Sequence, residues 1–250
     1  MNEELLFDLE AVFDPDDYLY FYKDILTEEL NILQVEFLVK TLSLKKKHKI
    51  LELACGYGRH SNRLAEMGFK VTGLDYIKGF LKIASAEAKK LNLPVKYVHG
   101  DMRDLPYKNE FDRVDLLFTA FGYFVDEENF QVLENVSRAL KKGGLFCFDL
   151  MNRDVFLKNF KPCFVHEKEG NFMIDRLVFD SLTGRNYTKR IVIRNGVLKH
   201  KPFFVRLYNY TELRDLLERA GMEIVESYGS FKGEQFGNDS ARMIIVARKV

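Results

Sequence analysis

Apolar residues follow two different spacings along the first 150 residues of the chain. Behind Thr27, a typical helix N-cap, residues 27–43 repeat apolar side chains every three or four positions, which predicts an amphipathic helix. Short apolar runs then recur, each ending in turn-forming or acidic residues. They predict strands at 50–55, 70–75, 95–99, 113–119 and 145–150, with helices at 62–67, 78–91 and 127–140. Strands that alternate with helices are typical of a parallel sheet.

The pattern changes after Asn152, where strand-like runs follow one another without a helix between them. These runs are 164–166, 172–179, 186–194 and 197–207. Turn residues separate them, and the strongest of these signals is Asn195-Gly196, because Asn-Gly between apolar runs is typical of a β-hairpin. A helix at 211–220 and strands at 222–227 and 243–247 complete the prediction.

We expect a single domain over residues 1–250, because no low-complexity or linker-like segment interrupts the pattern. Residues 1–48 are predicted to form an N-terminal helical lid, and residues 151–210 an antiparallel insertion. Within the lid, the aromatic stretch 18–22 fits either packing on the sheet or closure over a ligand. We expect packing for most of this stretch and ligand contact for Tyr22.

Composition and charge exclude several classes of protein. The 250 residues are 47% hydrophobic and 30% charged, and a net charge of +1 gives no overall field for holding nucleic acid. The longest uncharged apolar-rich stretch, 116–125, is about half the ~20 residues of a membrane-spanning helix, so no membrane contact is expected. The acidic N-terminus argues against an export signal. Three cysteines without C-x-x-C spacing indicate a reduced, cytoplasmic location, and the scattered histidines predict no metal site.

The most informative stretch follows the first predicted strand and reads Glu-Leu-Ala-Cys-Gly-Tyr-Gly-Arg-His over residues 52–60. Gly56 and Gly58 allow a tight turn and close approach of a ligand, because neither has a Cβ atom. A dinucleotide fingerprint would place Gly or Ala where the chain has Ser61, and no Walker loop follows. The glycines therefore indicate a ligand-binding turn without identifying the ligand.

Three more predicted strands end in residues suited to one ligand. Asp75 ends the second strand, where its carboxylate is placed to accept hydrogen bonds from a ribose diol. Gly100, Asp101 and Met102 follow the third strand and could read an adenine edge and cover its face. The aromatic segment 117–124 follows the fourth strand. Because the carboxyl ends of parallel strands meet at one edge of a sheet, these residues are expected to converge on one crevice.

Taken together, these segments resemble the class I S-adenosylmethionine-dependent methyltransferases. The match runs through residues 50–61, 71–84, 100–107, 111–123 and 139–150. The resemblance implies a doubly wound α/β fold with a seven-stranded, mostly parallel, Rossmann-like sheet whose last strand is antiparallel. It also implies that the hairpin insertion after the fifth strand covers the substrate. Within the family, the chain is similar to enzymes that methylate amines of sugars, glycine and other small molecules.

The resemblance implies S-adenosylmethionine as the cofactor, together with residues that bind its methionine, ribose and adenine parts. These are Glu52, Gly56 and Gly58 for the methionine part, Asp75 for the ribose hydroxyls, and Asp101 and Met102 for the adenine. Further expected cofactor contacts are Tyr22, Ala54, Arg59, His60, Tyr76, Gly100 and Phe118.

Several of these residues also have a purely structural interpretation. Glu52 could be satisfied by nearby backbone, and Asp75 could cap the following helix. His60 would contact the cofactor or act as a base, or else lie solvated in the first turn of a helix. Arg59 would pair with the cofactor carboxylate or remain a surface charge.

The implied activity is methyl transfer to a small molecule, at an amine or a hydroxyl, leaving S-adenosylhomocysteine. A base is needed for a hydroxyl or a protonated amine, and Tyr123, His60 and Tyr208 are the candidates. Arg206 would orient a polar or anionic substrate with its planar fork. In the alternative, Arg206 pairs with a surface carboxylate and both tyrosines pack on apolar neighbours.

Two other classes of function remain open from the sequence. A nicotinamide-dependent oxidoreductase uses a similar sheet, although Ser61 and the adenine element at 100–102 oppose it. A non-catalytic cofactor-binding or interaction module would also retain the fold. The expected partner is a small-molecule substrate, and the exposed edge of the hairpin insertion could in addition pair two subunits into a homodimer.

Overall fold

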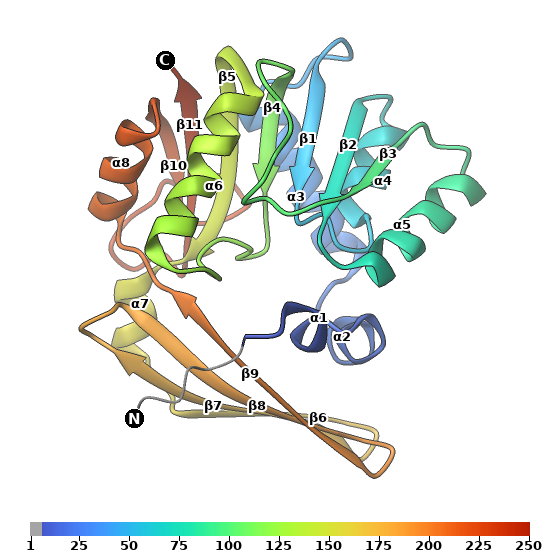
Figure 1. Ribbon diagram of the computed structural model, residues 1–250, viewed down its shortest axis with the longest axis vertical. Coiled ribbons are helices and arrows are strands. Elements are labelled where there is room, and N and C mark those ends of the chain that lie inside the picture. The colour runs from blue at the N-terminus through green and yellow to red at the C-terminus, as the bar shows by residue number, and fades with distance from the viewer. Residues whose placement is uncertain (1–6) are drawn as a thin grey trace.

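Residues 7–250, which the computed structural model describes, form two β-sheets with helices packed against them (Figure 1). The larger sheet has seven strands in the order β10-β11-β5-β4-β1-β2-β3. They are β1 (Lys49–Leu53), β2 (Lys70–Asp75), β3 (Lys96–His99), β4 (Phe111–Leu116), β5 (Leu140–Met151), β10 (Met222–Tyr228) and β11 (Arg242–Lys249). The pairs from β5 to β3 are parallel, whereas β11 is antiparallel to β5 and β10. The predicted fold class is therefore confirmed.

Helices cover both faces of this sheet. They are α3 (Glu28–Thr41), α4 (Arg59–Glu66), α5 (Lys78–Lys90), α6 (Asp126–Ala139) and α8 (Tyr210–Arg219). On one face, Leu38 of α3 and Leu64 of α4 join Ile50 of β1 in an apolar cluster. On the other face, Val136 of α6 and Leu213 of α8 pack against the central strands (Figure 1). The parallel strands are thus buried on both sides, and their carboxyl ends are left as the open edge.

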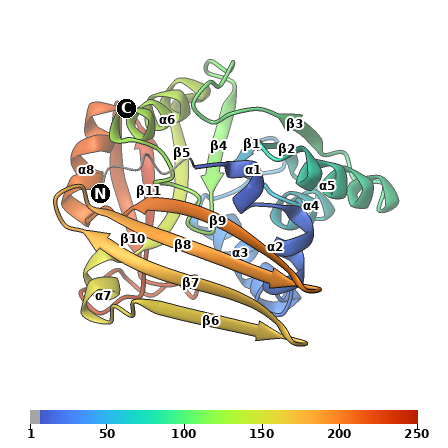
Figure 2. The same cartoon turned by 60° about the horizontal axis from the view of Figure 1, so that its bottom comes forward.

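The second sheet is antiparallel, with the order β6-β7-β8-β9. Its strands are β6 (Cys163–Lys168), β7 (Asn171–Asp180), β8 (Arg185–Arg194) and β9 (Val197–Arg206), and the short helices α1 (Leu9–Val12), α2 (Pro15–Tyr22) and α7 (Arg153–Lys158) lie near it. Figure 1 shows this sheet below the larger one, and Figure 2 shows α1 and α2 beside β9.

The N-terminal helices are packed on the second sheet by apolar side chains. Val12 of α1 contacts the cluster of Phe203 and Val205 on β9. Phe21 of α2 is clustered with Met173 and Val192 on β7 and β8. These helices therefore lie against the inner face of the second sheet, on the side that faces the larger sheet (Figure 2).

Some boundaries differ from the sequence prediction. The fourth strand was expected to reach residue 119 but ends at Leu116, because Phe118 and Thr119 adopt φ values of 66° and 58° that a strand does not allow. The fifth strand was expected to begin at residue 145 but begins at Leu140, and Gly143 within it has a φ of 72°. The helix α7 was not predicted. Within residues 7–250, no helix is long and apolar enough to cross a membrane.

Candidate functional site

A cavity opens at the carboxyl ends of β1, β2, β3 and β4. The predicted site residues that line it are Glu52, Ala54, Gly56, Arg59, His60, Asp75, Tyr76, Gly100, Asp101, Met102, Phe118 and Tyr123. The lining also includes side chains from the N-terminal helices and the segment between them, namely Leu9, Phe13 and Tyr18. Four predicted residues, Tyr22, Gly58, Arg206 and Tyr208, are not among the lining residues.

The two glycines of the loop after β1 have different surroundings. Gly56 has a φ of 55°, and a Cβ atom built on it would meet no atom within 4 Å. A Cβ atom on Gly58, at a φ of 81°, would lie 2.8 Å from the Cβ atom of Ala84 and would overlap the hydroxyl of Tyr97. Gly56 therefore leaves space open at the cavity. The placement expected for Gly58 is corrected: its missing side chain makes room for Tyr97 and α5 instead.

Asp75 links the end of β2 to that loop. Its Oδ2 atom accepts a hydrogen bond of 2.7 Å from the backbone N–H of Gly56, and its Oδ1 atom accepts one of 2.8 Å from Ile77, the N-cap of α5. Burial raises the pKa of Asp75, and these two bonds oppose the rise. Each carboxylate oxygen retains a second acceptor site. Asp75 thus orders the start of the helix and also faces the cavity.

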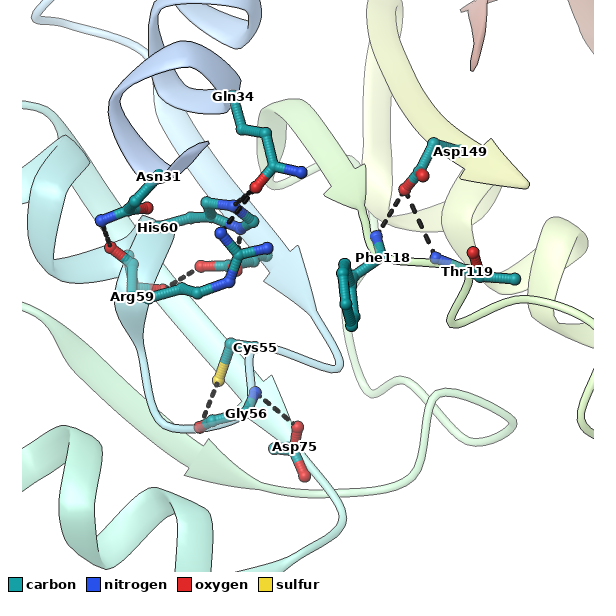
Figure 3. Close-up of polar contacts among 12 residues, drawn as sticks. Asn31, Gln34, Cys55, Gly56, Arg59, His60, Asp75, Phe118, Thr119 and Asp149 are labelled. Atoms are coloured by element: carbon teal, nitrogen blue, oxygen red, sulfur yellow. Dashed lines mark hydrogen bonds and ion pairs between the residues drawn. The ribbon is translucent and has the colours of Figure 1, made fainter. Parts of the chain in front are cut away.

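Glu52 belongs to a buried network of side chains. Figure 3 shows two other members of this network, His60 and Gln34. The Oε1 atom of Glu52 lies 3.2 Å from Nδ1 of His60, and its Oε2 atom accepts from the hydroxyl of Ser61. The other ring nitrogen of His60 lies 2.9 Å from Oε1 of Gln34, a residue of α3. The carboxylate is therefore satisfied by side chains rather than by backbone.

His60 is only 3% exposed, so the interpretation as a solvated first-turn residue is wrong. Burial, and secondarily the nearby Arg59 charge, lowers the pKa of His60 and favours the neutral ring. Gln34 was missed by the sequence analysis. It interrupts the apolar face of α3 between Leu30 and Leu38, and a polar residue in an apolar stripe signals a buried partner.

Arg59 opens α4 and crosses the network into the cavity (Figure 3). Its Nη1 atom donates a hydrogen bond of 2.6 Å to Oε1 of Gln34, and its guanidinium carbon lies 5.4 Å from the centre of the Phe118 ring. The Nη2 atom is buried and has no hydrogen-bond partner among the described residues. Burial lowers the pKa of Arg59. An unpaired buried guanidinium donor is suited to a carboxylate ligand.

Asp149 of β5, a residue that the sequence analysis missed, holds the turn after β4 in place. Its carboxylate accepts hydrogen bonds from the backbone N–H groups of Phe118 and Thr119 (Figure 3). It also pairs with Arg242 of β11. These bonds hold the two left-handed residues, which places the Phe118 ring on the cavity wall.

Asp101 is held by Arg103, two residues later in the sequence. Its Oδ2 atom lies 2.7 Å from Nη2 of Arg103, and its Oδ1 atom accepts from the Arg103 backbone N–H at 2.8 Å. Arg103 in turn pairs with Glu128 of α6 at 2.8 Å. Burial raises the pKa of Asp101, but the hydrogen bonds from Arg103 outweigh burial and lower it. The carboxylate is thus ionised and fixed beside Met102.

Aromatic rings form the wall on the side of the N-terminal helices. Tyr18 stacks on Tyr22 with ring centres 4.7 Å apart and meets Phe80 edge-on at 5.2 Å. Tyr123 meets Phe13 edge-on at 5.4 Å. The hydroxyls of Tyr18 and Tyr123 form no hydrogen bond within the described part of the chain, and burial raises the pKa of both.

Tyr22, expected at the cavity, lies behind Tyr18, where its hydroxyl accepts a hydrogen bond of 3.2 Å from Arg190. Arg206 and Tyr208 also lie elsewhere. Arg206 pairs with Glu212 at 2.6 Å and stacks over the Tyr208 ring at 4.4 Å. Tyr208 belongs to the main apolar core. The expectation that these side chains face the cavity is corrected in favour of the pairing and packing alternative.

Comparison with known proteins identifies what the chain is similar to. Residues 50–144 match the family model described as a methyltransferase domain. The glycine/sarcosine N-methyltransferase of Aphanothece halophytica is 28% identical over 220 residues, covering 86% of this chain and 81% of that protein.

Two solved structures have the same fold. The CcbJ methyltransferase from Streptomyces caelestis has a TM-score of 0.77 at 21% identity, covering 94% of this chain and 97% of its own. An S-adenosylmethionine-dependent methyltransferase from Clostridium acetobutylicum has a TM-score of 0.77 at 16% identity, covering 92% and 95%. Both similarities extend over the second sheet as well as the first.

Proposed function

We propose that this chain is a class I S-adenosylmethionine-dependent methyltransferase that methylates a nitrogen atom of a small molecule. The comparisons favour this class over the nicotinamide-dependent oxidoreductase and the non-catalytic module that the sequence left open. The comparisons do not identify the methyl acceptor, and the nitrogen acceptor is the more specific part of this proposal.

The residues of the cavity fit the cofactor. The open space at Gly56 allows a ligand to approach the loop, and the free acceptor sites of Asp75 suit two ribose hydroxyls. We propose that Arg59 binds the carboxylate of the methionine part through its unpaired Nη2 atom, and that Glu52 receives the amino group. Asp101 and Met102 would hold the adenine. The remaining lining residues that we propose as cofactor contacts are Ala54, His60, Tyr76, Gly100 and Phe118.

When bound, S-adenosylmethionine supplies an electrophilic methyl group on a sulfonium, so no nucleophilic side chain is needed. The chain must orient the acceptor in line and exclude water. The rings of Phe13, Tyr18 and Tyr123 suit both tasks, because aromatic faces exclude water and favour a nearby positive charge. We propose that these rings form the acceptor end of the cavity.

One observation carries the proposal of an amine acceptor: the acceptor end offers no ready base among residues 7–250. Burial raises the pKa of the Tyr18 and Tyr123 phenols, so both remain protonated near neutral pH. The two ring nitrogens of His60 lie 3.2 Å from Oε1 of Glu52 and 2.9 Å from Oε1 of Gln34, so both belong to the buried network on the other side of the cavity. A hydroxyl acceptor would need a base, whereas a neutral amine arrives with its lone pair available. The relative from Aphanothece halophytica is named for methylating amines, which supports the same choice.

We propose that the predicted lid and insertion form one cover over the cavity. The helices α1 and α2 and the segment between them contribute Leu9, Phe13 and Tyr18, while no residue of 151–210 is among the lining residues. The second sheet would therefore act on the cavity through the helices that pack on it. We also propose a cytoplasmic location, which the three unpaired cysteines favour. The proposed partner is a small-molecule substrate and not a nucleic acid.

The test combines binding with turnover. Calorimetry should detect binding of S-adenosylmethionine and S-adenosylhomocysteine but not of NADH. Radiolabelled methyl transfer should then occur with members of a panel of small primary and secondary amines, and not with matched alcohols. Turnover of alcohols alone, or NADH binding without S-adenosylmethionine binding, would overturn the proposal.

A further inference from the structure

Asp17, in the first turn of α2, joins that helix to the second sheet by three ion pairs. Its Oδ2 atom lies 2.7 Å from Nζ of Lys201 and 2.9 Å from Nζ of Lys199, both on β9. Its Oδ1 atom lies 3.2 Å from Nη1 of Arg194 on β8. Asp17 is 5% exposed and Lys201 is 4% exposed. A carboxylate and an ammonium this deeply buried depend on each other, because an unpaired buried charge is strongly unfavourable.

Because Asp17 lies in the first turn of α2, its ion pairs fix the orientation of this helix on the second sheet. Asp14 caps the helix by accepting a hydrogen bond of 3.0 Å from the Asp17 backbone N–H, so Asp17 sits where a negative charge also favours the helix dipole. At the other end of α2, Tyr22 accepts from Arg190, which pairs with Asp175 at 2.7 Å. Both ends of the helix are thus attached to the sheet by polar contacts.

The next residue in the sequence, Tyr18, lines the cavity. Successive side chains of an α-helix point about 100° apart, so the direction of Asp17 determines where the Tyr18 ring lies. A rotation of α2 about its axis would move both together. The other contacts of the Tyr18 ring within residues 7–250 are aromatic: it stacks on Tyr22, meets Phe80 edge-on and makes a tilted contact with Phe13.

We propose that Asp17 is a positioning residue: its ion pairs with Lys199, Lys201 and Arg194 make α2 and the second sheet one rigid cover and hold Tyr18 over the cavity. Asp17 is not itself among the lining residues of the main cavity, so its action on a bound ligand passes through Tyr18. This inference rests on the proposed function for the identity of the ligand. Beyond the proposed function, it identifies Asp17 as the residue that keeps the ligand enclosed.

The experiment uses S-adenosylhomocysteine as the probe and needs no acceptor. Asp17→Asn removes the charge and keeps the size of the side chain. We expect its complex to release S-adenosylhomocysteine about tenfold faster in stopped-flow displacement, with the association rate within about twofold of wild type. Hydrogen exchange of the amides of residues 15–22 should rise in the same variant. Asp17→Glu, which restores the charge, should recover part of the slow release.

The matched control is Asp24→Asn. Asp24 pairs with Lys168 of the second sheet at 2.6 Å, but its side chain is 66% exposed and lies past the end of α2. This variant removes the same kind of ion pair between the same two parts of the molecule. It should leave the release rate and the exchange of α2 unchanged. An equal acceleration in both variants would mean that any contact between helix and sheet suffices, and would overturn the specific role of Asp17.

A double-mutant cycle tests whether Asp17 acts through Tyr18. Tyr18→Ala should itself speed release, and adding Asp17→Asn to it should have little further effect. Full additivity would overturn the inference. If Asp17→Asn does not fold, Lys199→Gln, at a partly exposed side chain, should give a smaller acceleration that Tyr18→Ala again abolishes. If the wild type binds S-adenosylhomocysteine but Asp17→Asn and Lys199→Gln release it at the wild-type rate, only this inference is refuted. If the wild type neither binds S-adenosylhomocysteine nor transfers a methyl group, the proposed function is refuted.

Discussion

At the cofactor end of the cavity, Asp75 is held by the backbone N–H groups of Gly56 and Ile77, and Glu52 is held by His60 and Ser61 in the first turn of α4. At the acceptor end, Tyr18 and Tyr123 are held by ring packing, and their hydroxyls are left without partners in the described chain. The first end is therefore built from neighbours in the parallel sheet. The second is assembled from the N-terminal helices, the turn after β4 and the support of the second sheet. Under the proposed function, binding of the cofactor and binding of the acceptor would therefore depend on different parts of the chain.

The largest effect is expected from Gly56→Val, which should lower the affinity for S-adenosylmethionine by at least about a hundredfold. A Val side chain would fill the open space and resist the positive φ. Gly58→Val should instead act mainly on stability, because its side chain would collide with Tyr97 and Ala84. Thermal shift with and without the cofactor separates the two. A Gly56→Val protein that the cofactor still stabilises would contradict the assignment of the cofactor end.

Asp75→Ala should weaken S-adenosylmethionine binding by at least ~2 kcal/mol, about thirtyfold, because hydrogen bonds to a buried carboxylate contribute about that much. The fold should persist, since the variant leaves only two backbone N–H groups without this acceptor. Calorimetry on the folded variant gives the answer. Unchanged affinity would leave Asp75 as a cap of α5 alone.

On the cover, the stability contribution of Asp17 should depend on pH. Burial raises its pKa, but hydrogen bonds from its cationic partners more than offset burial and lower it from 3.8 to about 2. A folded-state pKa below the unfolded one stabilises the fold above about pH 4, and this contribution, roughly 2 kcal/mol, is lost as the pH falls through about 2. Urea unfolding at about pH 5 and about pH 2 should show a smaller change for Asp17→Asn than for wild type. Equal changes would show that the ion pairs add nothing to stability.

The smallest effect is expected from Tyr123→Phe, which should keep cofactor affinity within about twofold and reduce turnover of an identified amine by about fivefold, close to 1 kcal/mol. Arg206→Lys serves as the comparison, because its pairing with Glu212 lies outside the cavity. It should lower the melting temperature and leave turnover unaffected. Steady-state kinetics would contradict this distinction if Arg206→Lys lost more turnover than Tyr123→Phe.

The cofactor end was predictable because its residues follow directly from strand ends. Asp75 and the 100–102 element line the cavity for the same reason that the sequence suggested: parallel strands end at one edge. The roles of these residues toward the cofactor stay predictions. His60 shows the limit of the local pattern, since only the packing of α3 on α4 buries it.

The acceptor end was less predictable because distant segments build it. Tyr18 and Tyr22 are four residues apart and share one face of α2, so the spacing alone does not say which ring reaches the cavity. Arg206 lies at the end of β9 and Tyr208 just after it. The Arg206 guanidinium forms an ion pair with Glu212, six residues later, and so does not face the cavity. The partners of Asp17, nearly 180 or more positions away in the sequence, leave no local signal.

The second sheet supports the cavity without lining it, and this has an evolutionary consequence. Substitutions in β6–β9 away from the Asp17 partners Arg194, Lys199 and Lys201 would reach a bound acceptor through the helices that rest on the sheet, so those positions can drift with little immediate effect on catalysis. Changes in residues 9–18 alter the cavity wall directly. New acceptor preferences would thus be selected first in the N-terminal helices, and a library for altered specificity should diversify that short segment while keeping the sheet as a fixed frame.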